Sequence, residues 1–217
     1  MLERRKLPKI SAARAGDVCV AFELSEQAAR LLDDEVTPAE FVRKLIDAEC
    51  YAEAVSLIAH ALPKREAVWW SCLCARDALI DHLSAIGLTA LAAAETWVYK
   101  PTEENRRAAG TAATAVATGS LAGWPAFAAF WAGPDISPQG AGVMVAPAEH
   151  MSGKAVTTAV ALAAIRAEPQ KIGETFRRYL AQGIDIAAGG SGRQPSQQSP
   201  RAADSNAGPG KVGIMPC

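Results

Sequence analysis

The sequence has 217 residues, and its 22 Lys and Arg residues against 23 Asp and Glu residues give a formal net charge of -1. The excess of positive charge that nucleic-acid-binding proteins carry is absent, so no nucleic-acid partner is expected. Hydrophobic residues make up 50% of the chain and aromatic residues only 6%, an alanine-rich composition that favours closely packed helices. The 5 cysteines form no disulfide framework, which favours a reducing compartment and predicts a cytoplasmic protein.

The N-terminal part of the chain is predicted to be an arm followed by helices. Residues 1–24 are assigned to the arm, because the apolar run at residues 18–22 is too short to distinguish a strand from a helix start. Ser25 can cap a short helix. The clearest helix start lies at residues 37–40, where Thr, Pro and Glu stand at the N-cap, N1 and N3 positions. Its apolar stripe is expected to end at Pro63.

The rest of the chain predicts further helices and a tail. Apolar residues at helical spacing indicate helices over residues 65–84, 88–99 and 108–117, one after Pro125, one from Pro147 and one after Pro169. We therefore expect an all-α domain of about eight helices over residues 25–188, either a compact multi-helix bundle or a short solenoid of helical pairs. Residues 189–217, rich in Gly, Ser, Gln and Pro, predict a disordered tail, whose apolar end at residues 212–217 is interpreted as a frayed end rather than a docking peptide.

One uncharged stretch, residues 108–134, is long enough to cross a bilayer. It consists mostly of Ala, Thr and Gly rather than of the large apolar residues that drive membrane insertion. Gly123, Trp124 and Pro125 interrupt it near its middle. We therefore expect two buried helices here and no membrane partner, and a membrane-associated protein is the third-ranked alternative.

No residue pattern indicates a catalytic, cofactor-binding or metal-binding site. His60, His82 and His150 each lack a second ligand at the i+3 or i+4 spacing of a zinc site. A phosphate-binding loop, a nucleophile elbow and a dinucleotide fingerprint are missing from the sequence. Cys72 and Cys74 are interpreted as buried small hydrophobic residues. The protein is therefore predicted not to be an enzyme.

The alternative, an enzyme or toxin, would use a polar cluster in the predicted helix 65–84. Asp77 and Asp81 lie one turn apart, His82 follows, and Arg76 precedes them. An active site here would need a pocket with shifted pKa values. The preferred interpretation is a solvated helix face whose acids are neutralised by Arg76 or Lys64.

The strongest local signal is a pair of adjacent tryptophans on the same helix. Trp69 and Trp70 point about 100° apart, so one can fill the core while the other anchors a protein partner at the surface. With Lys64 and Arg65 just upstream, these four residues are the predicted partner-binding residues. The alternative is that both indoles serve helix packing alone.

Four segments, residues 51–54, 62–70, 94–98 and 101–109, together with the 163–165 and 176–180 motifs, resemble a family of small uncharacterised bacterial helical proteins. The genes of that family lie near type VI secretion components, among PAAR-type spike tips and effector adaptors. The resemblance covers residues 50–185, and its motifs concern packing, so no catalytic residue carries over. It implies a non-enzymatic adaptor or co-chaperone that helps to load effectors onto the spike tip. The implied partner is an effector, an effector chaperone or the PAAR-type spike tip, and the resemblance leaves the oligomeric state open.

Overall fold

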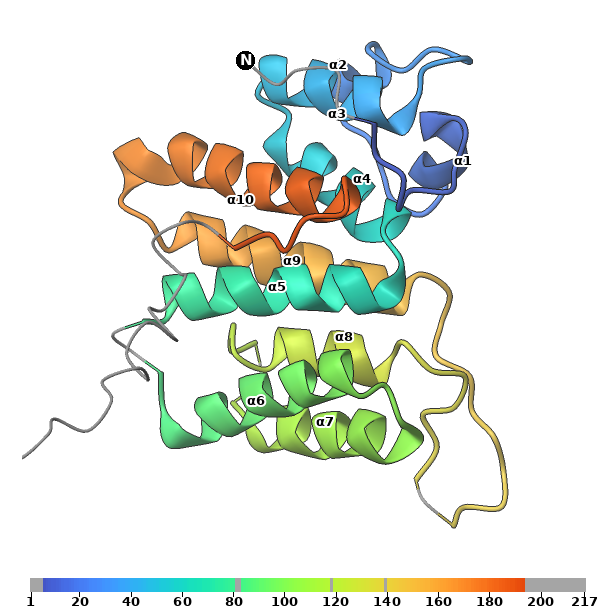
Figure 1. The fold of residues 1–217 in the computed structure, drawn as a ribbon, viewed down its shortest axis with the longest axis vertical. Coiled ribbons are helices and arrows are strands. Elements are labelled where there is room, and N and C mark those ends of the chain that lie inside the picture. Colours follow the sequence, from blue (N-terminus) through green and yellow to red (C-terminus); the bar gives the residue numbers. More distant parts are fainter. Residues whose placement is uncertain (1–5, 81–82, 118, 139, 194–217) are drawn as a thin grey trace, which may run out of the picture.

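The computed structural model describes residues 6–80, 83–117, 119–138 and 140–193 (Figure 1). Within these residues the chain forms ten α-helices and one 3-10 turn, and no strand. The predicted all-α class is confirmed. The helices are α1 Ala15–Cys19, α2 Glu26–Ala29, α3 Pro38–Asp47, α4 Tyr51–Ala61, α5 Lys64–Ala78, α6 Ala85–Tyr99, α7 Glu103–Ala115, α8 Trp124–Phe130, α9 Met151–Ile165 and α10 Ile172–Ala187, with the 3-10 turn at Pro169–Lys171.

Helices α5 and α9 form the middle of the molecule (Figure 1). On one side of them lie α6, α7 and α8, and on the other lie α4 and α10, with α1, α2 and α3 beyond α4. Helix α5 contacts α8, α9 and α10 as well as its sequence neighbours α4 and α6. Because a solenoid repeat contacts only its neighbours along the chain, this arrangement is a compact bundle.

Side-chain caps begin several helices as the sequence predicts. The Thr37 side chain accepts the Glu40 backbone N–H while the Glu40 carboxylate accepts the Thr37 N–H, a complete capping box. Ser25 caps α2 in the same manner by accepting the Ala28 N–H. These caps satisfy backbone donors that have no partner inside the helix.

Several helix boundaries differ from the prediction. The apolar stripe expected to continue from residue 38 to Pro63 forms two helices, α3 and α4, because Glu49 between them adopts the left-handed region with φ of 59°. The helix expected over residues 108–117 begins at Glu103 and ends at Ala115.

The helix expected over residues 65–84 ends at Ala78, and the Ser84 hydroxyl caps a new helix, α6, by accepting the Gly87 N–H. The helix expected from Pro147 begins at Met151, because His150 adopts the left-handed region with φ of 62°. A residue in that region cannot continue a right-handed helix.

The described structure extends beyond both ends of the predicted domain, residues 25–188. Inside the arm, α1 packs into the core, where Ala15 is fully buried and donates its N–H to the Val36 carbonyl at 2.8 Å. At the other end, the described chain continues past residue 188 as an ordered segment up to Arg193. The remainder of the predicted tail, residues 194–217, lies outside the described residues.

The uncharged stretch at residues 108–134 folds as predicted into two separate helices, the second half of α7 and then α8. Pro125 stands in the first turn of α8, where a missing backbone N–H costs nothing. Among the described residues, no helix combines the length and the apolar character that crossing a membrane requires.

Candidate functional site

The two adjacent tryptophans of α5 have opposite environments. Trp70 is fully buried, and its indole Nε1 donates to the Tyr179 carbonyl of α10 at 2.9 Å. Gly183 of α10 lies against the ring, and a Cβ added there would be 2.9 Å from it. Since no part of Trp70 reaches the surface, its assignment as a partner-binding residue is wrong: it holds α5 against α10.

Trp69 is only partly buried and lines a surface groove. Its indole Nε1 donates to the Ser191 carbonyl at 2.9 Å, and its ring meets Tyr99 of α6 edge-on at a centroid distance of 5.9 Å. The Arg193 guanidinium lies over the same indole, 5.2 Å from the ring centroid, and donates to the Tyr99 hydroxyl at 3.3 Å. The aromatic surface is therefore occupied by the chain's own C-terminal segment.

This segment, residues 189–193, is called the strap. It follows α10 and runs back along α5 (Figure 1). Positive φ values at Gly189 and Gly192, of 99° and 71°, reverse the chain direction. Asp185 then fixes the strap by accepting the Gly192 N–H at 3.0 Å. The prediction that disorder begins at residue 189 is therefore wrong, because these glycines make a specific turn instead of a flexible linker.

Two hollows flank the strap, with volumes of about 460 and 580 Å³. Trp69, Tyr99 and Arg193 line both of them. Arg193, which the strap supplies, therefore lies as a partition between the two hollows, and we call the two hollows together the Trp69 trough. The smaller hollow also includes Lys9, Arg65, Glu66, Val98, Ile186, Gly190 and Ser191, and the larger one Leu73, Arg76, Asp77, Leu79, Ile80, Leu83 and Glu95.

The two basic residues predicted to bind a partner are both exposed, but they belong to different sites. Arg65 lines the Trp69 trough, and its Nε donates to the Val98 carbonyl at 2.7 Å. Lys64 donates to the Ala132 carbonyl at 3.0 Å and lines a separate pocket. Of the four predicted residues, the structure therefore brings only Trp69 and Arg65 together.

Asp77, the described member of the alternative polar cluster, is held by groups on α10. Its carboxylate pairs with Arg178 at 2.8 Å and accepts the Tyr179 hydroxyl at 2.7 Å. Burial, followed by this hydrogen bond, raises the pKa of Tyr179. For Asp77, the predicted neutralisation by Arg76 or Lys64 is wrong, because Arg178 pairs with it while Arg76 pairs with Glu95 and Lys64 donates to the Ala132 carbonyl. Asp81 and His82 lie outside the described residues.

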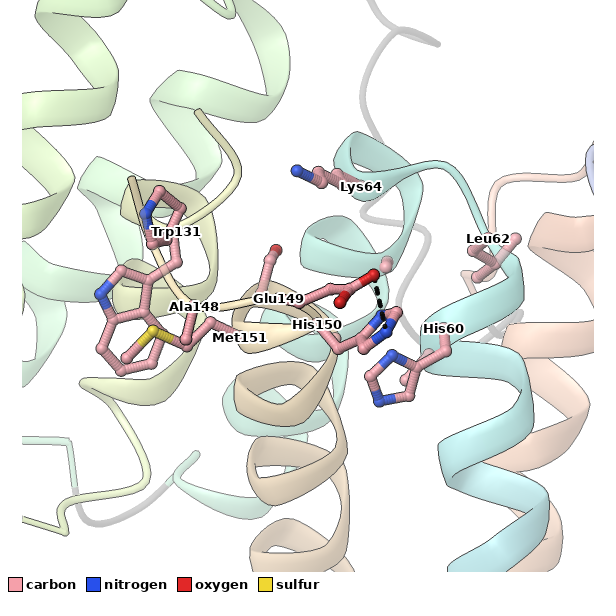
Figure 2. Close-up of a pocket in the computed structure, with 13 residues that line it drawn as sticks. His60, Leu62, Lys64, Trp131, Ala148, Glu149, His150 and Met151 are labelled. Carbon is pink, nitrogen blue, oxygen red and sulfur yellow. Dashed lines mark ion pairs between the residues drawn. The ribbon is translucent and has the colours of Figure 1, made fainter. Parts of the chain in front are cut away.

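A second pocket, of about 310 Å³, contains two histidines that are distant in the sequence (Figure 2). His60, at the end of α4, and His150, before α9, point toward one another with ring centroids 5.7 Å apart. A Cβ on Gly153 would overlap the His60 ring, so this glycine makes room for it. Trp131 and Met151 lie on the far side of the pocket (Figure 2).

His60 is an electrically neutral imidazole at pH 7. Burial lowers its pKa to about 4, and the nearby His150 and Lys154 act in the same direction. Its Nε2 is buried without a hydrogen-bond partner, and the His150 Nε2 lies 3.4 Å from a Glu149 carboxylate oxygen. A neutral imidazole can accept a proton or bind a metal, but no group of three metal-ligating side chains occurs in the part of the chain that the structure describes.

No sequence pattern predicts this pocket, because local spacing does not reveal that His60 meets His150 across two helices. The cysteines were predicted correctly: Cys72 and Cys74 are fully buried, and burial raises the pKa of both thiols.

Comparison with known proteins places this helical domain in a family. No curated protein and no solved structure matches the chain. A family model, described as a family of unknown function (DUF6931), matches residues 41–187. The match spans α4 to α10 in full, including the parts of α5, α6 and α10 that form the Trp69 trough and the helices around the His60 pocket. The chain belongs to the DUF6931 family.

Proposed function

We propose that the protein is a non-enzymatic accessory that binds other proteins, an adaptor or co-chaperone, and that the Trp69 trough is its binding surface. One observation carries this proposal: the trough already holds a short segment of the chain itself. Trp69 binds a backbone carbonyl of the strap, and the aromatic rings bind the Arg193 side chain. A backbone carbonyl and an arginine side chain are groups that a segment of another protein can also present.

The trough combines a partly apolar lining with a polar rim, as protein interfaces do. Leu73 and Leu79 are buried beside it, whereas Ile80 and Tyr99 are 81% and 65% exposed. Ion pairs between Lys9 and Glu66 and between Arg76 and Glu95 lie in its walls. Trp and Tyr are the residues most often found at the centres of protein–protein interfaces.

The contacts of the strap are weak enough for an external segment to replace them. An exposed cation–π contact contributes about 0.5–1 kcal/mol, and a single hydrogen bond contributes about 0.5–1.5 kcal/mol. Ser191 and Arg193 are both exposed. A partner with more contacts along the 460 and 580 Å³ hollows can therefore compete for Trp69.

The partner class that we propose is an effector of type VI secretion, an effector chaperone or a PAAR-type spike tip, met in the cytoplasm. This choice rests on the family resemblance of the packing motifs at residues 51–70 and 94–109. The competing proposal, an enzyme that uses Asp77, is not favoured, because Arg178 and Tyr179 already bind that carboxylate.

The test is affinity capture with the intact chain and two tryptophan variants. Trp69→Ala removes the centre of the trough, and Trp131→Ala is the matched control, because Trp131 is also partly buried but lines the His60 pocket. We expect the partner to be lost with Trp69→Ala and kept with Trp131→Ala, while circular dichroism shows both variants to be helical.

Equal capture by Trp69→Ala and by the intact chain would overturn the proposed surface. Mass spectrometry of the captured protein tests the narrower proposal. An effector, chaperone or spike-tip protein supports a role in type VI secretion, and a partner of another kind overturns that role while leaving the binding function in place.

A further inference from the structure

We propose that the strap is an intramolecular stand-in for the partner, and that the partner presents an arginine side chain, flanked by small residues, to the same face of Trp69. This inference rests on the proposed function and adds the chemistry of the recognised segment. It also gives the strap a role: it occupies the centre of the trough until an external segment replaces it.

The arginine requirement follows from the two aromatic rings. The central carbon of the Arg193 guanidinium lies over the indole, 5.2 Å from the ring centroid, while the guanidinium donates to the Tyr99 hydroxyl. A planar guanidinium with several N–H donors can stack and donate at once, whereas a lysine ammonium is a compact, strongly hydrated charge. The pair Trp69 and Tyr99 therefore favours arginine over lysine.

The requirement for small residues follows from the space beside the strap. Gly192 is buried, and a Cβ added there would lie 2.7 Å from Ile186 and 3.1 Å from Leu73. A Cβ on Gly190 would overlap the Asp185 carboxylate. The backbone can therefore reach the Trp69 N–H only where the residues next to the bound carbonyl have little or no side chain.

Competition follows from the position of Arg193. Its side chain lines both hollows and separates them, so an external segment cannot pass through the trough while Arg193 lies over Trp69. A segment tethered to the site has a high effective concentration there. Occupancy by the strap therefore lowers the apparent affinity of any external peptide in proportion to the fraction of free sites.

The experiment uses the intact chain and a synthetic peptide that copies residues 189–193, acetylated and amidated at its ends, with a second peptide in which its arginine is alanine. Binding is followed by the NMR resonance of the Trp69 indole N–H, assigned with Trp69→Phe. Two protein variants open the site. Arg193→Ala removes the partition, and Gly192→Ala, which cannot keep a φ of 71° without strain, displaces the strap and leaves the trough's side chains on α5, α6 and α10 unchanged.

We expect the arginine peptide to bind Arg193→Ala and Gly192→Ala about three- to tenfold more tightly than it binds the intact chain, as loss of a contact of this strength implies. The alanine peptide should bind weakly to the intact chain and to both variants. Its affinity for each of them should be lower than the affinity of the arginine peptide for the variants. Equal affinity of the arginine peptide for the intact chain and both variants would overturn competition by the strap, and equal affinity of the two peptides would overturn the arginine requirement.

The peptide-binding experiment and the affinity-capture experiment can fail independently. If partner capture depends on Trp69 but the two peptides bind alike, the arginine inference fails and the binding function stands. If capture is indifferent to Trp69→Ala, the proposed function fails whatever the peptides do.

Discussion

Trp69 and Trp70 are neighbours on one helix and make the same kind of hydrogen bond, yet Trp70 holds α5 against α10 whereas Trp69 binds the strap at the surface. Each indole N–H donates to a backbone carbonyl at 2.9 Å, that of Ser191 for Trp69 and that of Tyr179 for Trp70. The carbonyl that Trp70 binds belongs to α10 and is enclosed by the core, whereas the carbonyl that Trp69 binds belongs to the exposed strap. Burial of the surroundings, and not the bond itself, separates a fold-stabilising contact from one that an external segment can replace.

The largest effect is expected for Trp70→Ala. Removing a fully buried indole leaves a cavity between α5 and α10 and removes the hydrogen bond to the Tyr179 carbonyl, so the free energy of unfolding should fall by about 3–5 kcal/mol. Urea denaturation followed by circular dichroism measures this loss. A loss below about 1 kcal/mol would show that Trp70 is not a core residue.

Gly183→Ala tests the same contact between α5 and α10 from the α10 side. The added Cβ would lie 2.9 Å from the Trp70 ring, and overpacking of this kind costs about 1–3 kcal/mol of unfolding free energy. Gly16→Ala is the matched control, because a Cβ on Gly16 meets nothing within 4 Å. The same denaturation experiment should find the control as stable as the original chain, and equal losses in both variants would contradict close packing at Gly183.

Trp69→Ala is expected to cost the fold much less than Trp70→Ala. The lost contacts are partly exposed, namely the bond to Ser191, the edge-on Tyr99 ring and the Arg193 guanidinium, so we expect a decrease of about 1–2 kcal/mol. Equal decreases in the free energy of unfolding of Trp69→Ala and Trp70→Ala, measured in urea, would contradict the different roles of the two tryptophans.

The buried imidazole of His60 makes the stability of the fold depend on pH. An unfolded histidine titrates near about 6.5, and the folded His60 has its pKa lowered to about 4. Between these values the unfolded chain takes up a proton that the folded chain refuses, so the stability contributed by neutral His60 is present above pH 6.5 and is lost as the pH falls toward 4. His60→Phe should therefore show a smaller decrease in melting temperature between pH 7 and pH 5 than the original chain. Identical decreases would contradict the burial of a neutral His60.

The sequence predicted local features well, because they depend on neighbouring residues. The Thr37 capping box, the helix start at Pro125 and the buried pair Cys72 and Cys74 follow from spacing and side-chain type alone. The two tryptophans were placed about 100° apart, but the choice of the buried one depends on where α10 packs. That position is set by contacts such as Gly183 with Trp70, which lie far apart in the sequence.

The parts of the site that the sequence missed arise from long-range contacts or from glycines. The strap has the composition of a flexible linker, and its order depends on Asp185, Trp69 and Tyr99, which no local pattern connects to it. His60 and His150 meet only because α4 and α9 pack together. Spacing rules for metal or catalytic pairs cannot detect such a meeting.

The most direct test of the binding surface is photo-crosslinking from single positions in the intact chain. A benzoylphenylalanine replaces Ile80, an exposed residue of the Trp69 trough, or Val20, an exposed residue just after α1 that serves as a control outside the trough. We expect a crosslinked partner from position 80, absent from position 20 and reduced by an excess of the arginine peptide. The same partner at equal yield from both positions, or no crosslink from position 80, would contradict the assignment of the trough as the protein-binding site.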